Sequence, residues 1–186
     1  MHPNLYYYIL TSLSQIVGGT ETWVGEFPFS VLIGDTEREN WVCSGVLLNT
    51  QFVLTAAHCK ETSVENFKLR LGVHFVAGEK EHNRNDPHVQ NFDIPSKNFV
   101  IHWDFTKENN VVKNDIALIK LPRPAKLNSL AQPACWKTQA PINSNPVLVG
   151  WGKTDNIISY KIGGLYSNKQ YKVEVMVIRF HNFQSR

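Results

Sequence analysis

The hexapeptide Leu54-Thr55-Ala56-Ala57-His58-Cys59 places a histidine beside a cysteine at the end of an apolar segment. The preceding residues, Gln51–Thr55, are typical of a short β-strand because apolar residues dominate them. Residues 55–59 would then form a single helical turn after that strand. A lone histidine in such a position is usually a packed core residue, so the hexapeptide by itself assigns no function.

Apolar segments of the same kind recur on both sides of this stretch. They are rich in Val, Ile, Leu and aromatic residues, and turn residues such as Gly34-Asp35 and Pro122-Arg123-Pro124 separate most of them. The predicted strands are Phe27–Ile33, Trp41–Leu48, Gln51–Thr55, Phe67–Gly72, Ile116–Leu121, Val147–Trp151 and Tyr171–Phe180. No long segment has a 3.6-residue apolar period, so the sequence predicts an all-β barrel or sandwich.

Composition and charge exclude several classes of protein. The chain has 186 residues, 42% hydrophobic and 19% charged, which is too apolar for a disordered protein. No apolar run approaches the roughly 18 residues that span a bilayer. The net charge is +3: residues 1–152 carry 13 basic and 14 acidic residues, and residues 153–186 carry 6 and 2. Because the basic residues of 153–186 are spread out, we expect a solvated surface there rather than an anion site, and neither nucleic acid nor a membrane as a partner.

The N-terminal residues and the cysteine count bear on the cellular compartment. Leu5–Leu10 followed by Thr11–Ser14 resembles the apolar core and small-residue end of a signal peptide, although no Lys or Arg precedes it. Residues 1–15 are therefore either a leader remnant or an arbitrary segment before the domain. Three cysteines in a secreted chain imply one pair and one thiol that lacks an internal partner.

Three further motifs accompany the hexapeptide in a fixed order. They are Ile16-Val17-Gly18-Gly19, Asn114-Asp115-Ile116-Ala117-Leu118-Ile119-Lys120-Leu121, and Val149-Gly150-Trp151-Gly152. Each motif alone has an ordinary structural explanation; for example, an Asp before a strand is usually a cap or turn residue. Together the four motifs resemble the trypsin/chymotrypsin family of serine peptidases, over residues 16 to about 178. The long interval from His58 to Asp115 looks most like the arthropod clip-type branch.

The resemblance implies a fold of two six-stranded antiparallel β-barrels with the active site between them. We expect residues 16–125 to form a complete first barrel. Residues 126–186 would supply a linker and an incomplete second barrel, because the proline-rich stretch 120–146 suits a connection between lobes.

The resemblance also assigns roles to individual residues. His58 would be the general base that takes a proton from a serine hydroxyl, and Asp115 would hold the other ring nitrogen and fix the tautomer. Cys43 and Cys59 would form a disulfide, and Cys135 matches a position that joins a partner chain in many relatives. Ile16 would become the N-terminus after activation, but it follows Gln15 instead of the Arg or Lys that a trypsin-like activator cuts after.

One element of the family pattern is missing from these 186 residues. The nucleophile of the family lies in a Gly-Asp-Ser-Gly-Gly segment, and the serines after Trp151, namely Ser159, Ser167 and Ser185, have no flanking glycines. We therefore expect a serine endopeptidase by family that is inactive as this chain, acting on protein or peptide substrates or other proteases outside the cell. The alternatives are a secreted, non-catalytic protease homologue that binds its partners, and a degenerate product that does not fold stably.

No cofactor or metal is expected. Calcium binding in the loop after Gly72 would use Glu79 and Glu81, but Val73 stands where a ligand is required. The histidines at positions 74, 82, 88 and 102 do not have the spacing of a zinc site, and we expect all four at the surface.

Overall fold

The structure is a computed structural model, and it describes residues 7–8, 19–35, 41–60, 64–75, 86–108, 111–135, 147–151 and 170–174. The residues expected to form the activation N-terminus lie outside this part, as do the three serines that follow Trp151. The described part is almost entirely β-structure with two short 3₁₀ turns, Ala57–Cys59 (η1) and Ser96–Asn98 (η2). The all-β fold class predicted from the sequence is confirmed.

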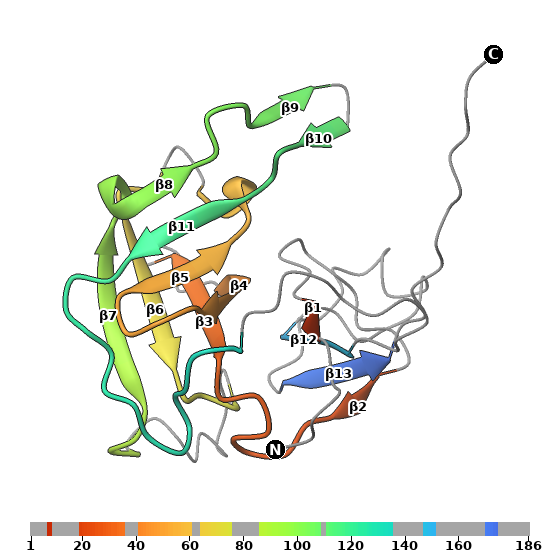
Figure 1. The fold of residues 1–186 in the computed structure, drawn as a ribbon, viewed down its shortest axis with the longest axis vertical. Coiled ribbons are helices and arrows are strands. Elements are labelled where there is room, and N and C mark those ends of the chain that lie inside the picture. Colours follow the sequence, from red (N-terminus) through yellow and green to blue (C-terminus); the bar gives the residue numbers. More distant parts are fainter. Residues whose placement is uncertain are drawn as a thin grey trace.

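A curled sheet of seven antiparallel strands forms most of the described chain (Figure 1). Its spatial order is β7-β6-β3-β4-β5-β11-β8. The strands are β3 (Ser30–Asp35), β4 (Trp41–Leu47), β5 (Phe52–Thr55), β6 (Asn66–Leu71), β7 (Gln90–Pro95), β8 (Phe99–Ile101) and β11 (Ala117–Lys120).

Alternation of buried and exposed side chains gives this sheet a single apolar inner face. In β6, Phe67, Leu69 and Leu71 are buried while the residues between them lie toward solvent. In β7 the residues opposite them, Phe92 and Ile94, are buried in the same way. Side chains two residues apart share a face of a strand, so this register places all five on the inner face. Ile33, Val53 and Ile119 from other strands complete the same cluster.

A second, smaller sheet has the order β1-β12-β13-β2. Its strands are β1 (Tyr7–Tyr8), β12 (Val147–Gly150), β13 (Tyr171–Glu174) and β2 (Thr20–Glu21), and β1 runs parallel to β12. Phe27 and Phe29 pack against Val147 and Val149 in a separate cluster. The remaining strands, β9 (Thr106–Glu108) and β10 (Val111–Lys113), pair as an exposed hairpin.

The sequence interpretation was wrong about where the first long strand begins. We expected a strand from Phe27, but β3 begins at Ser30, because the Ser30 N–H donates to the Phe27 carbonyl and closes a turn around Pro28. Strands β7 and β8 were not among the predicted strands.

Residues 121–135 run along the first sheet: for example, the Ala125 N–H donates to Thr50 O and the Ala134 N–H to Leu47 O.

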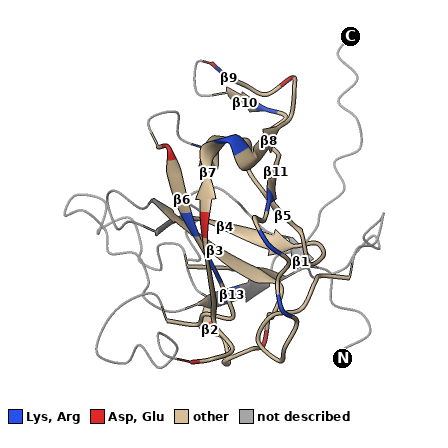
Figure 2. Cartoon of the chain, turned by 90° about the vertical axis from the view of Figure 1, so that its left-hand side faces the viewer, with Lys and Arg blue, Asp and Glu red and all other residues tan. Residues whose placement is uncertain are grey.

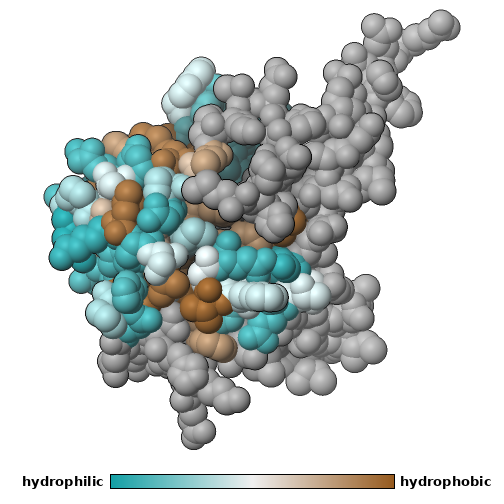
Figure 3. All heavy atoms as spheres, turned by 60° about the horizontal axis from the view of Figure 1, so that its bottom comes forward, coloured by the Kyte–Doolittle hydropathy of each residue, from teal (hydrophilic) through white to brown (hydrophobic). Residues whose placement is uncertain are grey.

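Surface charge in the described part is mixed. In the cartoon of Figure 2, the positions of acidic and basic residues are scattered over the strands and loops of the described part. The face in Figure 3 carries its apolar residues as small patches between hydrophilic ones. Within the described residues, no helix has the length and apolarity that crossing a bilayer requires.

Candidate active site

His58 lies in the short turn η1, directly after β5. The Cys59 N–H donates to the Ala56 carbonyl and the Lys60 N–H to the Ala57 carbonyl, so the backbone tightens as it leaves the strand. Ala57 and Cys59 are buried on either side of His58, which anchors the turn in the core. The imidazole itself remains 19% exposed, so it is held from both sides and still reaches solvent.

Asp115 lies two residues before the start of β11, the strand that pairs with β5. Thr55 lies opposite Ala117 in this antiparallel pair, so the residues after Thr55 meet the residues before Ala117. Asn114 has φ = 52°, a left-handed conformation that Asn adopts more readily than most residues. Its Nδ2 donates to Asp104 O at 2.9 Å, and its carbonyl accepts the Ile116 N–H at 2.8 Å. The register and this bend together bring Asp115 to His58.

The Asp115 carboxylate contacts His58 through both oxygens. Oδ1 accepts the backbone N–H of His58 at 2.8 Å, and Oδ2 lies 2.6 Å from ring atom Nδ1. The Asp115 side chain is 26% exposed. An ionised carboxylate can only accept, so this geometry suits the imidazole tautomer that has its proton on Nδ1 and a lone pair on Nε2. That atom can take a proton from an approaching hydroxyl group.

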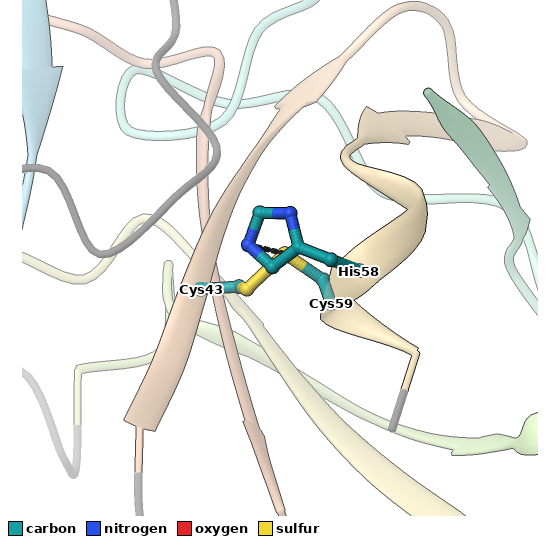
Figure 4. A group of neighbouring side chains, drawn as sticks. All are labelled: Cys43, His58 and Cys59. Atoms are coloured by element: carbon teal, nitrogen blue, oxygen red, sulfur yellow. Dashed lines mark hydrogen bonds between the residues drawn. A yellow bond between two sulfur atoms is a disulfide. The ribbon is translucent and has the colours of Figure 1, made fainter. Parts of the chain in front are cut away.

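A disulfide joins Cys43 of β4 to Cys59, next to His58 (Figure 4). The dashed line in Figure 4 marks a 3.9 Å contact between Cys59 Sγ and His58 Nε2. A disulfide sulfur has no hydrogen to donate, so this contact does not consume the lone pair of Nε2. The same three residues have the spatial grouping of a metal site, but their sulfurs are bonded to one another and are not thiolates. The chemistry of the donor set therefore argues against a metal here.

The other residues singled out in the sequence lie apart from this pair. Cys135 is an exposed free thiol. Val73 is buried, so the position that a calcium ligand would occupy faces the protein interior. Glu79, Glu81 and His82 lie outside the described residues, and so do Gln15 and Ile16.

The expectation that His74 lies at the surface was wrong. Its side chain is buried, with ring atom Nδ1 3.4 Å from Thr22 Oγ1 and Nε2 3.5 Å from Glu21 Oε1. The His74 carbonyl accepts the Trp151 Nε1–H at 3.0 Å and the Gln170 N–H at 3.2 Å. These partners come from distant parts of the chain, and the contacts of Thr22 and Glu21 with the two ring nitrogens provide polar partners for the buried ring.

Sequence reasoning also missed the role of Asn114. The signal was present, because Asn directly before the Asp of a strand-opening motif is a residue suited to positive φ. What the sequence did not indicate is the bond from Asn114 to Asp104, which depends on where the β8–β9 loop lies.

Comparison with known proteins is consistent with this geometry. A family model described as Trypsin matches residues 16–182. The chain is 32% identical over 154 residues to phenoloxidase-activating factor 3 of Holotrichia diomphalia, covering 76% of this chain and 43% of that protein. It is 30% identical over 154 residues to the CLIP domain-containing serine protease HP8 of Bombyx mori, covering 76% and 42%. The chain thus spans less than half the length of these relatives.

A solved structure shares the fold. The structure of neuropsin, a serine protease expressed in the limbic system of mouse brain, matches with a TM-score of 0.70 at 24% identity. The match covers 87% of this chain and 64% of that one. The curled sheet and the strands that carry His58 and Asp115 therefore belong to an architecture already seen in solved structures.

Proposed function

Because this chain belongs to the trypsin family of serine peptidases, we propose that His58 and Asp115 are the general base and the orienting acid of a peptide-bond hydrolysing site. The observation that carries the proposal is the double contact of Asp115 with His58, at 2.8 Å and 2.6 Å. It leaves Nε2 as a base on a partly exposed ring. In such a site the base takes the proton of a serine hydroxyl as that oxygen attacks the substrate carbonyl, and later returns it to the leaving amine.

Asp115 has a distinct task in this proposal. When Nε2 gains the proton, the imidazole becomes positively charged, and the adjacent carboxylate stabilises that charge. The contact from Oδ1 to the His58 backbone N–H fixes the carboxylate, so Oδ2 stays in line with Nδ1. The disulfide to β4 holds the turn that carries the ring. The pair is thus preorganised before any substrate arrives.

The 186 residues do not contain a Gly-Asp-Ser-Gly-Gly segment. We therefore propose that this chain by itself does not cleave peptide bonds. Loss of a triad serine costs on the order of 10⁶ in turnover, because nucleophile and base act as one unit. The missing Gly-Asp-Ser-Gly-Gly segment also favours a second candidate function. In that case the chain is a non-catalytic protease homologue that binds protein substrates or other proteases.

Two measurements separate these candidates. A fluorophosphonate probe applied to the 186-residue chain should label nothing, and stoichiometric labelling of a serine in it would overturn the proposed inactivity. The transcript should then be sequenced past the codon for Arg186. An in-frame Gly-Asp-Ser-Gly-Gly whose serine is labelled in the longer protein, but not after His58→Ala, supports the peptidase. A stop codon together with abundant secreted protein selects the homologue.

Location, partners and organisation follow as proposals. The disulfide between Cys43 and Cys59 is typical of oxidising compartments, which supports a secreted, extracellular protein. The exposed thiol of Cys135 is accessible for a disulfide with a partner chain. We place the first barrel within residues 16–125 and the linker and partial second barrel within 126–186. Non-reducing electrophoresis of secreted protein tests the partner, because Cys135→Ser should abolish any linked species.

A further inference from the structure

Thr22, His74 and Gln170 lie where the two sheets meet. There the Thr22 N–H donates to the Gln170 carbonyl at 3.0 Å, and Thr22 Oγ1 donates to Gln170 Oε1 at 3.0 Å. The buried ring of His74 lies beside Thr22. His74 and Gln170 of this group line a small cavity of about 10 Å³, and so does Ser30, the first residue of β3. The remaining lining comes from Gly25, Phe27, Gly72, Val73 and Leu130.

Ser30 differs from its polar neighbours in this cavity. Its side chain is buried at 7% exposure, yet among the described residues its hydroxyl oxygen has no hydrogen-bond partner. Its backbone N–H is already used, because it donates to the Phe27 carbonyl. His74 and Gln170, by contrast, both have polar contacts with the Thr22 hydroxyl. A buried hydroxyl without a partner costs free energy, and native proteins rarely retain one.

We propose that this cavity is a binding site for one buried water molecule held by the Ser30 hydroxyl. A volume of about 10–15 Å³ is what a single water needs, and such waters make about three hydrogen bonds to polar walls. The polar side chains of His74 and Gln170 border the same space and supply further partners. The size excludes phosphate, carboxylates and organic ligands. The water would connect β3 of the first sheet to the segment that leads into β13 of the second.

The direction in which one substitution changes the Tm tests this site. The Tm is measured on the 186-residue chain with its disulfide intact. If the hydroxyl holds a water, Ser30→Ala removes a satisfied polar group and leaves the water short of a partner, so the Tm should fall by about 2–4 °C. If the hydroxyl has no partner, the same change removes a penalty, and the Tm should stay constant or rise. The matched control is Ser129→Ala, because Ser129 is exposed, and its Tm should equal that of the parent.

A second measurement detects the bound water directly and does not depend on stability. A water with a long residence time gives nuclear Overhauser effects to protons near it, and we expect one between water and the Ser30 β-protons. It should disappear in Ser30→Val, which removes the hydroxyl and fills the space. A Tm that does not fall in Ser30→Ala overturns the site, and so does the lack of the water signal in the parent chain. Neither result depends on whether the chain cleaves peptides.

Discussion

Asp115 holds His58 at two points, with Oδ1 on its backbone N–H and Oδ2 on its ring Nδ1. The two contacts link the start of β11 to the turn after β5, strands that pair through Thr55 and Ala117. A one-residue slip of this register would move Asp115 to the opposite face. The geometry of the candidate base is therefore a consequence of strand pairing in the first sheet.

The first prediction concerns the contact itself. A proton held between Nδ1 and a carboxylate oxygen should give a resonance far downfield in the ¹H NMR spectrum, and Asp115→Ala should abolish it. The variant also leaves two donors of His58 without their acceptor, so the free energy of unfolding should fall by about 1–3 kcal/mol. Urea unfolding measures the second effect. Asp93→Ala, at an exposed position of β7, is the control and should keep both properties.

The second prediction concerns the bend before Asp115. Asn114 has φ = 52°, which a β-branched side chain tolerates poorly, so Asn114→Val should lower the free energy of unfolding by about 2 kcal/mol. Asn114→Gly accepts this φ but loses the bond to the Asp104 carbonyl, so it should lose less. Both variants should weaken the His58 resonance. Equal stability of Asn114→Val and Asn114→Gly would show that the left-handed backbone is not the cause.

The sequence predicted the central strands of the first sheet because apolar residues dominate β4, β5 and β11 and recur at every second position of β6. β4, β5, β6 and β11 lie within one residue of the expected ranges. β7 and β8 were not predicted as strands, because β7 has only two apolar residues, Phe92 and Ile94, before its terminal proline, and β8 is only three residues long. Their pairing with β6 and β11 gives them strand structure.

Long-range contacts explain the features that the sequence did not reveal. His74 is flanked by the apolar residues Val73 and Phe75, but its neighbours in sequence do not reveal the polar partners that a buried ring requires. Its partners Thr22 and Trp151 lie 52 and 77 residues away. The pairing of β2 with β13 is equally non-local. His58 and Asp115 were found because a family pattern carries long-range information that local propensity does not.

The third prediction concerns the cysteines. Only Cys135 is free and exposed, so a thiol reagent should titrate one group in the native chain and three after reduction and unfolding. Reducing the bond between Cys43 and Cys59 opens a loop with a sequence separation of 16, which should cost roughly 3 kcal/mol of stability. Peptide mapping without reductant identifies the linked pair. A Cys59–Cys135 peptide would contradict the structure.

The last prediction concerns Gly45, which lies in β4 opposite Val31 and has no room for a side chain. A β-carbon there would lie 2.7 Å from Val53 Cγ1 and 2.9 Å from the Leu54 carbonyl oxygen. Val53 is fully buried, and the Leu54 carbonyl belongs to the backbone of β5, so neither can move without shifting that strand. Gly45→Ala should therefore lower the free energy of unfolding by about 1–3 kcal/mol, the usual cost of overpacking.

The position of β5 makes this variant informative about the site as well. β5 ends at Thr55, three residues before His58, so a strand displaced by Gly45→Ala should also broaden or shift the downfield His58 resonance. Ser44→Ala is the matched control, because it changes the neighbouring residue of β4 and keeps the Ser44 carbonyl that accepts the Thr55 hydroxyl. If Gly45→Ala unfolds at the same urea concentration as Ser44→Ala with an unchanged His58 signal, then close packing between β4 and β5 does not position the histidine.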